Sequence, residues 1–254
     1  MTKKSLLRIV IFYLIGISIS NVFRFDLLHL NESIEKTSLW LIIFFSPLEA
    51  IGLLIGAFMS IYLLRKERNT EISVFGYSIK WSILMSVLPI LLLTIIGVDN
   101  SRGENAHYYG FIAGIATFVY CFAEEYGWRG YLQDELKSIK EWQRVLIIGT
   151  LWYLWHLSFI QNRDILDNLQ FLGWMIFGSW GIGKITDLTK SIFVASCFHM
   201  IIQIMMFNRL IRNGIDGTEK LIILTVSVII WIVIIVFWVK KTKRLSAKKI
   251  QLNQ

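Results

Sequence analysis

The chain has 254 residues, of which 55% are hydrophobic and 17% charged, and it carries a net charge of +8. Long apolar runs in such a composition exclude an ordinary soluble domain and indicate an integral membrane protein. The positive charge does not indicate a nucleic-acid partner, because Lys and Arg gather at the ends of the apolar runs, where membrane topology accounts for them. Cys121 and Cys197 lie singly in apolar runs, without metal-ligand or redox spacing.

In chain order, eight apolar segments each approach the ~20 residues that a helix needs to cross a bilayer. They cover residues 6–23, 39–64, 79–98, 107–128, 144–161, 168–185, 190–207 and 220–239. The first follows three basic residues as a signal peptide would, but it lacks a small-x-small cleavage site, so we expect it to remain as an anchor. The sequence therefore predicts an all-α, polytopic transmembrane helix bundle of about eight spans. Residues 1–254 would form a single integral membrane domain in the cell membrane.

The distribution of basic residues predicts the orientation. With both termini in the cytoplasm, 19 Lys and Arg residues lie on the inner side and 7 on the outer side. This bias agrees with the positive-inside rule. The basic tail from residue 240 to 249 is read as a stop-transfer anchor attracted to anionic lipid.

Two pairs of glycines predict close helix packing. Gly52 and Gly56 lie four residues apart, as do Gly110 and Gly114. Such small-xxx-small faces let membrane helices approach closely, so these pairs indicate packing and carry no functional signal.

Ionisable residues inside the predicted spans are rare and by default suggest a functional site: they are Glu49, Glu124, Glu125, Arg129, His156 and His199. His156 lies 12 residues after Arg144 and His199 lies 9 residues after Lys190. At ~1.5 Å per residue, both histidines then lie ~13–18 Å from the inner boundary, a depth that Glu124 can also reach. We therefore expect polar groups from three helices to converge in one cavity on the cytoplasmic half.

Local spacing supports the same expectation. Glu125 and Arg129 are four residues apart on one helix face and can pair, whereas Glu124 is rotated by about 100° toward another neighbour. Simpler readings stay open: the Glu pair could mark an interfacial helix end, and an intramembrane His often makes only a helix–helix hydrogen bond. Glu49 could pair within the bundle or line the cavity.

Three short motifs carry a resemblance to a known family. They are "EEYGWR" with Glu124, Glu125 and Arg129, "WYLWH" with Trp152 and His156, and "HMIIQ" with His199 and Gln203. In this order they resemble the EExxxR, FxxxH and HxxxN pattern of the CAAX protease and bacteriocin-processing (Abi) family, which includes the type II CAAX prenyl proteases. The motif-bearing core would span about 107–207. Trp152 replaces the usual Phe, and Gln203 replaces the frequent Asn with an amide that is one methylene longer.

The resemblance implies a glutamate-dependent intramembrane endopeptidase. Carried onto this chain, Glu124 would be the base that activates water, assisted by His156. His199 and Gln203 would stabilise the oxyanion, while Glu125 and Arg129 would orient the site, with Trp152 supporting His156. Since neither intramembrane His has a Glu beside it, the HExxH zinc motif is absent, and a site without cofactor is favoured, with zinc as the alternative.

The residues leave the chemistry and the substrate open. The same cavity could serve an acyltransferase acting on a lipid-linked substrate, or a peptide-sequestering immunity protein that cuts nothing. The expected partners are membrane lipid and a peptide or lipid-anchored protein substrate, with no nucleic acid.

Overall fold

The computed structural model describes residues 2–30, 38–64, 70–156 and 164–252, with side chains described as far as Trp238. Throughout these ranges the regular elements are helices, with one isolated parallel bridge between Ser73 and Ser191. The elements are α1 (Lys3–Arg24), α3 (Leu41–Phe45), α4 (Leu48–Tyr62), α5 (Ile79–Ile96), α6 (Ala106–Glu125), η1 (Tyr126–Gln133), α7 (Glu141–Trp155), α9 (Ile165–Thr189), α10 (Ile192–Ile202), η2 (Gln203–Phe207) and α11 (Gly217–Leu252). The prediction of an all-α fold is confirmed for this part of the chain.

Capping side chains explain where several helices begin. Among the described helices, the side chain before the first helical residue accepts a backbone N–H in six cases: Thr2 for α1, Ser78 for α5, Asn105 for α6, Asp164 for α9, Ser191 for α10 and Asp216 for α11. Such caps satisfy N–H groups that have no partner within the helix, which matters most where water is scarce.

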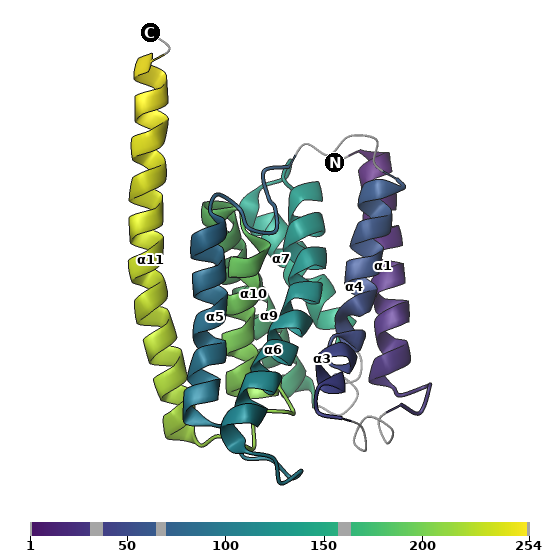
Figure 1. Ribbon diagram of the computed structural model, residues 1–254. Coiled ribbons are helices and arrows are strands. Elements are labelled where there is room, and N and C mark those ends of the chain that lie inside the picture. The colour runs from purple at the N-terminus through teal and green to yellow at the C-terminus, as the bar shows by residue number, and fades with distance from the viewer. Residues whose placement is uncertain (1, 31–37, 65–69, 157–163, 253–254) are drawn as a thin grey trace.

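The helices form a bundle in which α1 and α4 pack together on one side and α11 lies at the opposite edge (Figure 1). α4 contacts α6, α6 contacts α5 and α10, α7 contacts α9, and α11 contacts α5. Both chain termini lie toward the same end of the bundle, and α11 projects beyond the other helices there (Figure 1). α6 lies between two buried apolar clusters, since Cys121 belongs to one and Ala123 to the other.

Four of the described helical segments are long and apolar enough to cross a membrane: Lys3–Arg24, Ile79–Ile96, Ala106–Gln133 and Gly217–Trp238. Leu48–Tyr62 and Ile192–Phe207 are shorter apolar helices. Each of the eight predicted spans overlaps a helix, but the count of eight spans and the orientation of the termini stay predictions.

Two predicted spans differ from the observed helices. The segment predicted over 39–64 is divided into α3 and α4 around Ser46 and Pro47, because proline has no N–H to continue the hydrogen bonding of α3. The segment predicted over 144–161 ends earlier, at Trp155, and residues 157–163 lie outside the described residues.

The predicted glycine packing is confirmed. A Cβ atom on Gly56 would lie 2.7 Å from the carbonyl oxygen of Phe12, so no larger residue fits between α4 and α1 at this point. A Cβ atom on Gly114 would lie 3.2 Å from the Ile90 side chain, which places α6 tightly against α5. The contact at Gly114 holds α6 against α5 and so helps to position the end of α6, where the two glutamates lie.

The stretch after the two glutamates is a buried continuation of α6. η1 continues α6 as a π-helix, and seven of its eight residues, including Trp128 and Arg129, are buried. Polar groups here have partners within the protein, for example in the hydrogen bond from Gln133 Nε2 to Asp187 Oδ1 at 2.9 Å.

Candidate active site

Glu124 and Glu125 are the last two residues of α6, immediately before η1, and both are fully buried. π-Helical turns are rare and are found frequently at functional sites. A second π-helix, η2, begins at Gln203, so two of the three motifs lie where an α-helix changes to a π-helix. Because adjacent helical residues point about 100° apart, the two carboxylates have different partners.

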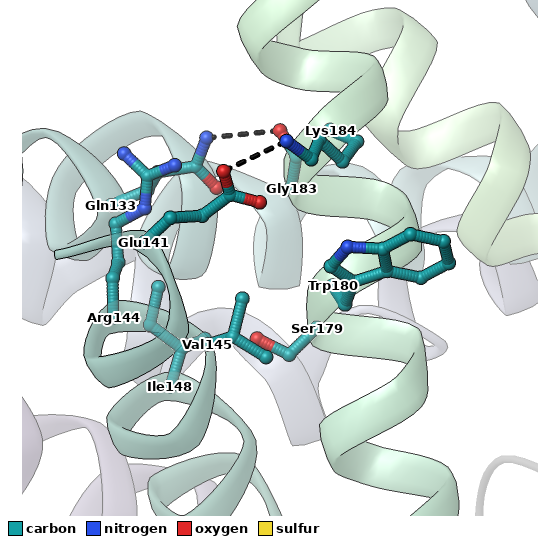
Figure 2. Close-up of a pocket in the computed structure, with 9 residues that line it drawn as sticks. All are labelled: Gln133, Glu141, Arg144, Val145, Ile148, Ser179, Trp180, Gly183 and Lys184. Atoms are coloured by element: carbon teal, nitrogen blue, oxygen red, sulfur yellow. Dashed lines mark hydrogen bonds and ion pairs between the residues drawn. The ribbon is translucent and has the colours of Figure 1, made fainter.

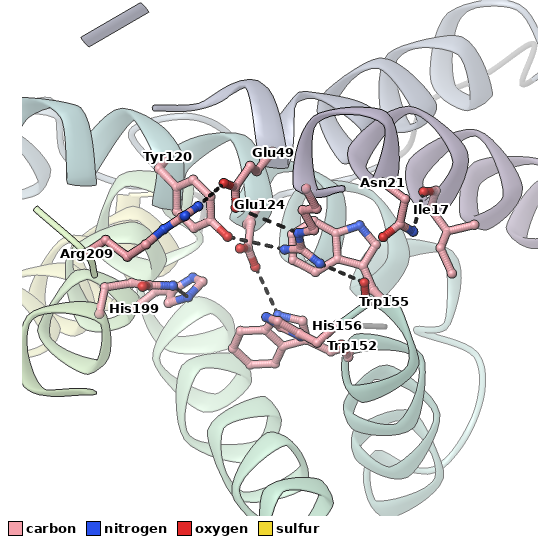
Figure 3. A network of polar contacts seen from close by, with 12 residues as sticks. Ile17, Asn21, Glu49, Tyr120, Glu124, Trp152, Trp155, His156, His199 and Arg209 are labelled. Atoms are coloured by element: carbon pink, nitrogen blue, oxygen red, sulfur yellow. Dashed lines mark hydrogen bonds and ion pairs between the residues drawn. The ribbon is translucent and has the colours of Figure 1, made fainter. Parts of the chain in front are cut away.

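The two oxygens of the Glu124 carboxylate have different surroundings. Its Oε2 accepts a hydrogen bond of 2.9 Å from the indole Nε1 of Trp152, on α7 (Figure 3). Its Oε1 is buried and has no hydrogen-bond partner among the residues described. A buried polar atom without a partner costs free energy unless water or a ligand satisfies it. The protein therefore orients Oε2 of Glu124 and leaves Oε1 available to a water molecule or a ligand.

The Glu125 carboxylate, in contrast, has a cationic partner. It forms the predicted ion pair with Arg129 at 2.9 Å, and neither side chain is exposed. Its Oε1 also lies 2.8 Å from Nδ1 of His199, on α10. The Arg129 guanidinium stacks over the Trp152 ring at 4.8 Å from its centroid. Glu125 and Arg129 thus link the EExxxR segment to both histidine-bearing helices.

His199 and Gln203 form a pair one turn apart, as the sequence spacing indicated. Nε2 of His199 lies 3.3 Å from Nε2 of the Gln203 amide. The simplest proton assignment is that the amide N–H donates to Nε2, while a proton on Nδ1 faces Glu125. In this arrangement both ring nitrogens of His199 have neighbours within the protein. The predicted oxyanion role of His199 and Gln203 stays a prediction.

His156 is the residue that follows the last helical residue of α7. We had expected it to lie within the helix. Its Nδ1 lies 2.8 Å from the carbonyl oxygen of Trp152. Since a carbonyl only accepts, Nδ1 carries the proton and Nε2 is the acceptor nitrogen of the neutral ring. The ring also packs edge-to-face against Trp155 and Phe171. Trp152 therefore connects the first and second motifs, with its indole N–H on Glu124 and its carbonyl oxygen on His156.

The structure brings all the sequence-predicted site residues into one connected cluster at the junction of α6, α7 and α10: Glu124, Glu125, Arg129, Trp152, His156, His199 and Gln203. In Figure 3, the Glu124 carboxylate and the ring of His199 point toward the indole of Trp152. This convergence matches the common depth inferred from helix lengths. The catalytic role of each residue stays a prediction.

Glu49, Tyr120 and Arg209 lie beside this cluster (Figure 3), and Arg24 contacts Tyr120 and Trp155. Sequence reasoning left the role of Glu49 open and did not single out the other three. Glu49 accepts a hydrogen bond of 2.7 Å from Arg209 and lies 4.0 Å from Arg24. Of the two readings left open for Glu49, pairing within the bundle is therefore the observed one. Tyr120 precedes Glu124 by one helical turn, a spacing that could have marked it as a neighbour.

The contacts of the site residues show whether they could hold a metal ion. The residues that the structure describes contain no group of three or more His, Cys, Asp and Glu side chains close enough to hold a metal ion. The Glu125 carboxylate faces the cationic Arg129, which competes with any metal for its oxygens. These side chains do not fit a zinc site of the usual kind, in which three or four His, Cys or carboxylate ligands converge on one ion.

A small hollow lies between α7 and α9 (Figure 2). It is lined by polar and apolar side chains, and an ion pair of 2.8 Å between Lys184 and Glu141 crosses its rim. None of the seven predicted site residues lines it. It lies beside the site, since Gly178, next to the lining residue Ser179, accepts a hydrogen bond of 3.5 Å from Arg129.

Comparison with protein families gives one match. Residues 107–205 match the family described as Type II CAAX prenyl endopeptidase Rce1-like. This segment is Rce1-like. The match confirms the resemblance inferred from the three motifs. Comparison with curated proteins finds no match.

The Rce1-like segment begins in the first turn of α6 and ends within η2, so it contains all seven predicted site residues. Together with the apolar helices, it indicates a membrane protein whose residues 107–205 are similar to CAAX-type intramembrane proteases. Arg24 and Glu49 come from α1 and α4, outside the Rce1-like segment.

Proposed function

We propose that this protein is a glutamate-dependent intramembrane endopeptidase in which Glu124 activates a water molecule. The observation that carries the proposal is the asymmetric environment of the Glu124 carboxylate. Oε2 is fixed by the Trp152 indole, and the buried Oε1 lacks a hydrogen-bond partner among the described residues. A water bound to Oε1 would satisfy it and would be oriented for attack.

In this mechanism Glu124 accepts a proton from the water as the oxygen attacks the peptide carbonyl carbon. The neutral ring of His156, with its proton on Nδ1, presents an acceptor nitrogen that assists this transfer. The proton then passes to the departing amine as the C–N bond breaks. The Gln203 amide would donate a hydrogen bond to the oxyanion, after exchanging its contact with His199 for one with substrate. His199 would donate from Nε2 as an imidazolium, with its Nδ1 proton still facing Glu125.

Glu125 has a different role from Glu124 in this proposal. Because its carboxylate is paired with Arg129 and lies against His199, it is poorly placed to take a proton from water. It instead fixes the orientation of His199 and joins η1 to α10. A buried ion pair in this position makes the site rigid, which favours a single productive geometry.

The substrate in this proposal is a membrane-associated peptide or a lipid-anchored protein, because the site is buried among apolar helices. The chain would lie in the cell membrane with about eight spans and both termini in the cytoplasm. The position of both termini at one end of the bundle supports an even number of crossings (Figure 1).

The decisive variant is Glu124→Gln. Its amide oxygen can still accept the hydrogen bond from Trp152, but the side chain cannot take up a proton from water. We expect product formation from a candidate leader peptide in intact membranes to be abolished, while abundance stays near that of the wild type, because a neutral amide is less costly to bury than a carboxylate. Glu141→Gln, on the exposed ion pair with Lys184, is the matched control and should leave processing unchanged.

If Glu124→Gln keeps full function, the protein is not a glutamate-dependent protease. A role in binding or sequestering a peptide would then replace the proposal.

A further inference from the structure

Arg24 is a buried cation beside the candidate active site. It is the last residue of α1, and its side chain is 2% exposed. It lies outside the Rce1-like segment, so the family match says nothing about it. A buried guanidinium is costly unless its donors are used, and the partners of Arg24 show where they are used.

The guanidinium makes contacts with two different helices. Nη1 donates a hydrogen bond of 2.7 Å to the carbonyl oxygen of Trp155, on α7. Nη2 donates a hydrogen bond of 3.3 Å to the hydroxyl of Tyr120, on α6. The guanidinium carbon also lies 3.3 Å from the centroid of the Trp155 ring, in a cation–π contact.

These two anchor points are adjacent to the proposed catalytic pair. Trp155 is the last residue of α7 and is followed directly by His156. Tyr120 lies one turn before Glu124 on the same face of α6, and Figure 3 shows the two side by side. One planar group therefore bridges the backbone next to His156 and the side chain next to Glu124.

Arg24 shares the carboxylate of Glu49 with Arg209. Its Nε lies 4.0 Å from Glu49 Oε2, and the other oxygen of Glu49 accepts from Arg209 at 2.7 Å. The two arginines differ in environment, since the side chain of Arg209 is 70% exposed and that of Arg24 is buried. Of these two arginines, Arg24 is the one whose hydrogen bonds join α6 and α7.

We propose that Arg24 is a positioning residue, which holds α6 and α7 so that Glu124 and His156 address the same water. The proposal rests on the proposed function of Glu124. Lysine cannot reproduce the role, because its single ammonium lacks the rigid fork that contacts two partners at once. Loss of the bridge would let the two groups drift apart, and a displacement of ~1 Å in an active site can cost about 10²-fold in rate.

The test compares Arg24→Lys with Arg209→Lys in proteoliposomes, using a leader peptide that the wild type cleaves. Both changes keep a cation near Glu49. They differ because only Arg24→Lys alters the contacts with α6 and α7. We expect Arg24→Lys to lower kcat by about 10- to 100-fold with KM nearly unchanged. Arg209→Lys should match the wild type. Tyr120→Phe removes one arm of the bridge and should lower kcat less than Arg24→Lys.

Abundance and thermal unfolding of each variant are measured alongside. A wild-type kcat for Arg24→Lys, with Glu124→Gln inactive, would overturn this inference and leave the proposed function intact. A loss of activity in Arg24→Lys that merely follows a loss of folded protein would also overturn it. Full activity of Glu124→Gln would instead refute the proposed function itself.

Discussion

Replacing Glu125 with Gln tests how the site is held together. The variant keeps the shape of the side chain but removes its charge, and it leaves the guanidinium of Arg129 without its anionic partner. Because both side chains of this pair are completely buried, bulk solvent does not screen or replace the lost charge. Removing one partner of a buried ion pair typically costs about 3–5 kcal/mol. The Gln amide oxygen can still accept one hydrogen bond, so we expect a value near the lower end.

The control for this variant is again Glu141→Gln. Glu141 and Lys184 form an ion pair of 2.8 Å, with side chains that are 44% and 47% exposed. Exposed ion pairs contribute about 0–1 kcal/mol, so this variant should be close to the wild type in stability.

The assay is thermal unfolding of the purified protein in detergent, together with its abundance in membranes. Glu125→Gln should unfold several degrees below the wild type and accumulate less, and it should also lose activity because His199 loses its anionic neighbour. Equal midpoints for Glu125→Gln and Glu141→Gln would refute the reasoning, because they would show that the buried pair contributes no more than an exposed one.

Three further predictions follow from the site and the topology. Trp152→Phe keeps an aromatic side chain and introduces the usual family residue, but it removes the donor to Glu124. We expect processing per folded protein to fall about tenfold or more, and unchanged processing would show that the indole N–H has no role. Activity of the purified protein should persist in EDTA; loss with EDTA and recovery with zinc would make His156 and His199 candidate ligands. A reporter fused after Lys240 should be cytoplasmic, and an outer location would overturn the predicted orientation.

Much of the site could be predicted from sequence because it depends on local spacing and depth. The i,i+4 spacing of Glu125 and Arg129 predicted their ion pair, and it is present. Similar distances from the ends of apolar segments predicted that Glu124, His156 and His199 would meet, and they lie in one connected cluster. Both inferences need only the regular rise and rotation of a helix.

Other features could not be predicted, because they depend on which helices become neighbours. The π-helical segments after Glu125 and at Gln203 have no sequence signal of their own and depend on tertiary packing. The hydrogen bond from Trp152 to Glu124 joins residues 28 positions apart, and that from Arg24 to Trp155 joins residues 131 apart. Arg24 directly follows the first predicted span, and nothing in the sequence placed it against α6 and α7.

The central claim is that Glu124 activates a water molecule that becomes part of the product. The most direct measurement is cleavage of a leader peptide in proteoliposomes prepared in H₂¹⁸O, followed by mass spectrometry of the products. We predict that the wild type places one solvent oxygen in the new carboxyl terminus and that Glu124→Gln yields no labelled product. Labelled product from Glu124→Gln at the wild-type rate, or a wild-type product without solvent oxygen, would contradict the account.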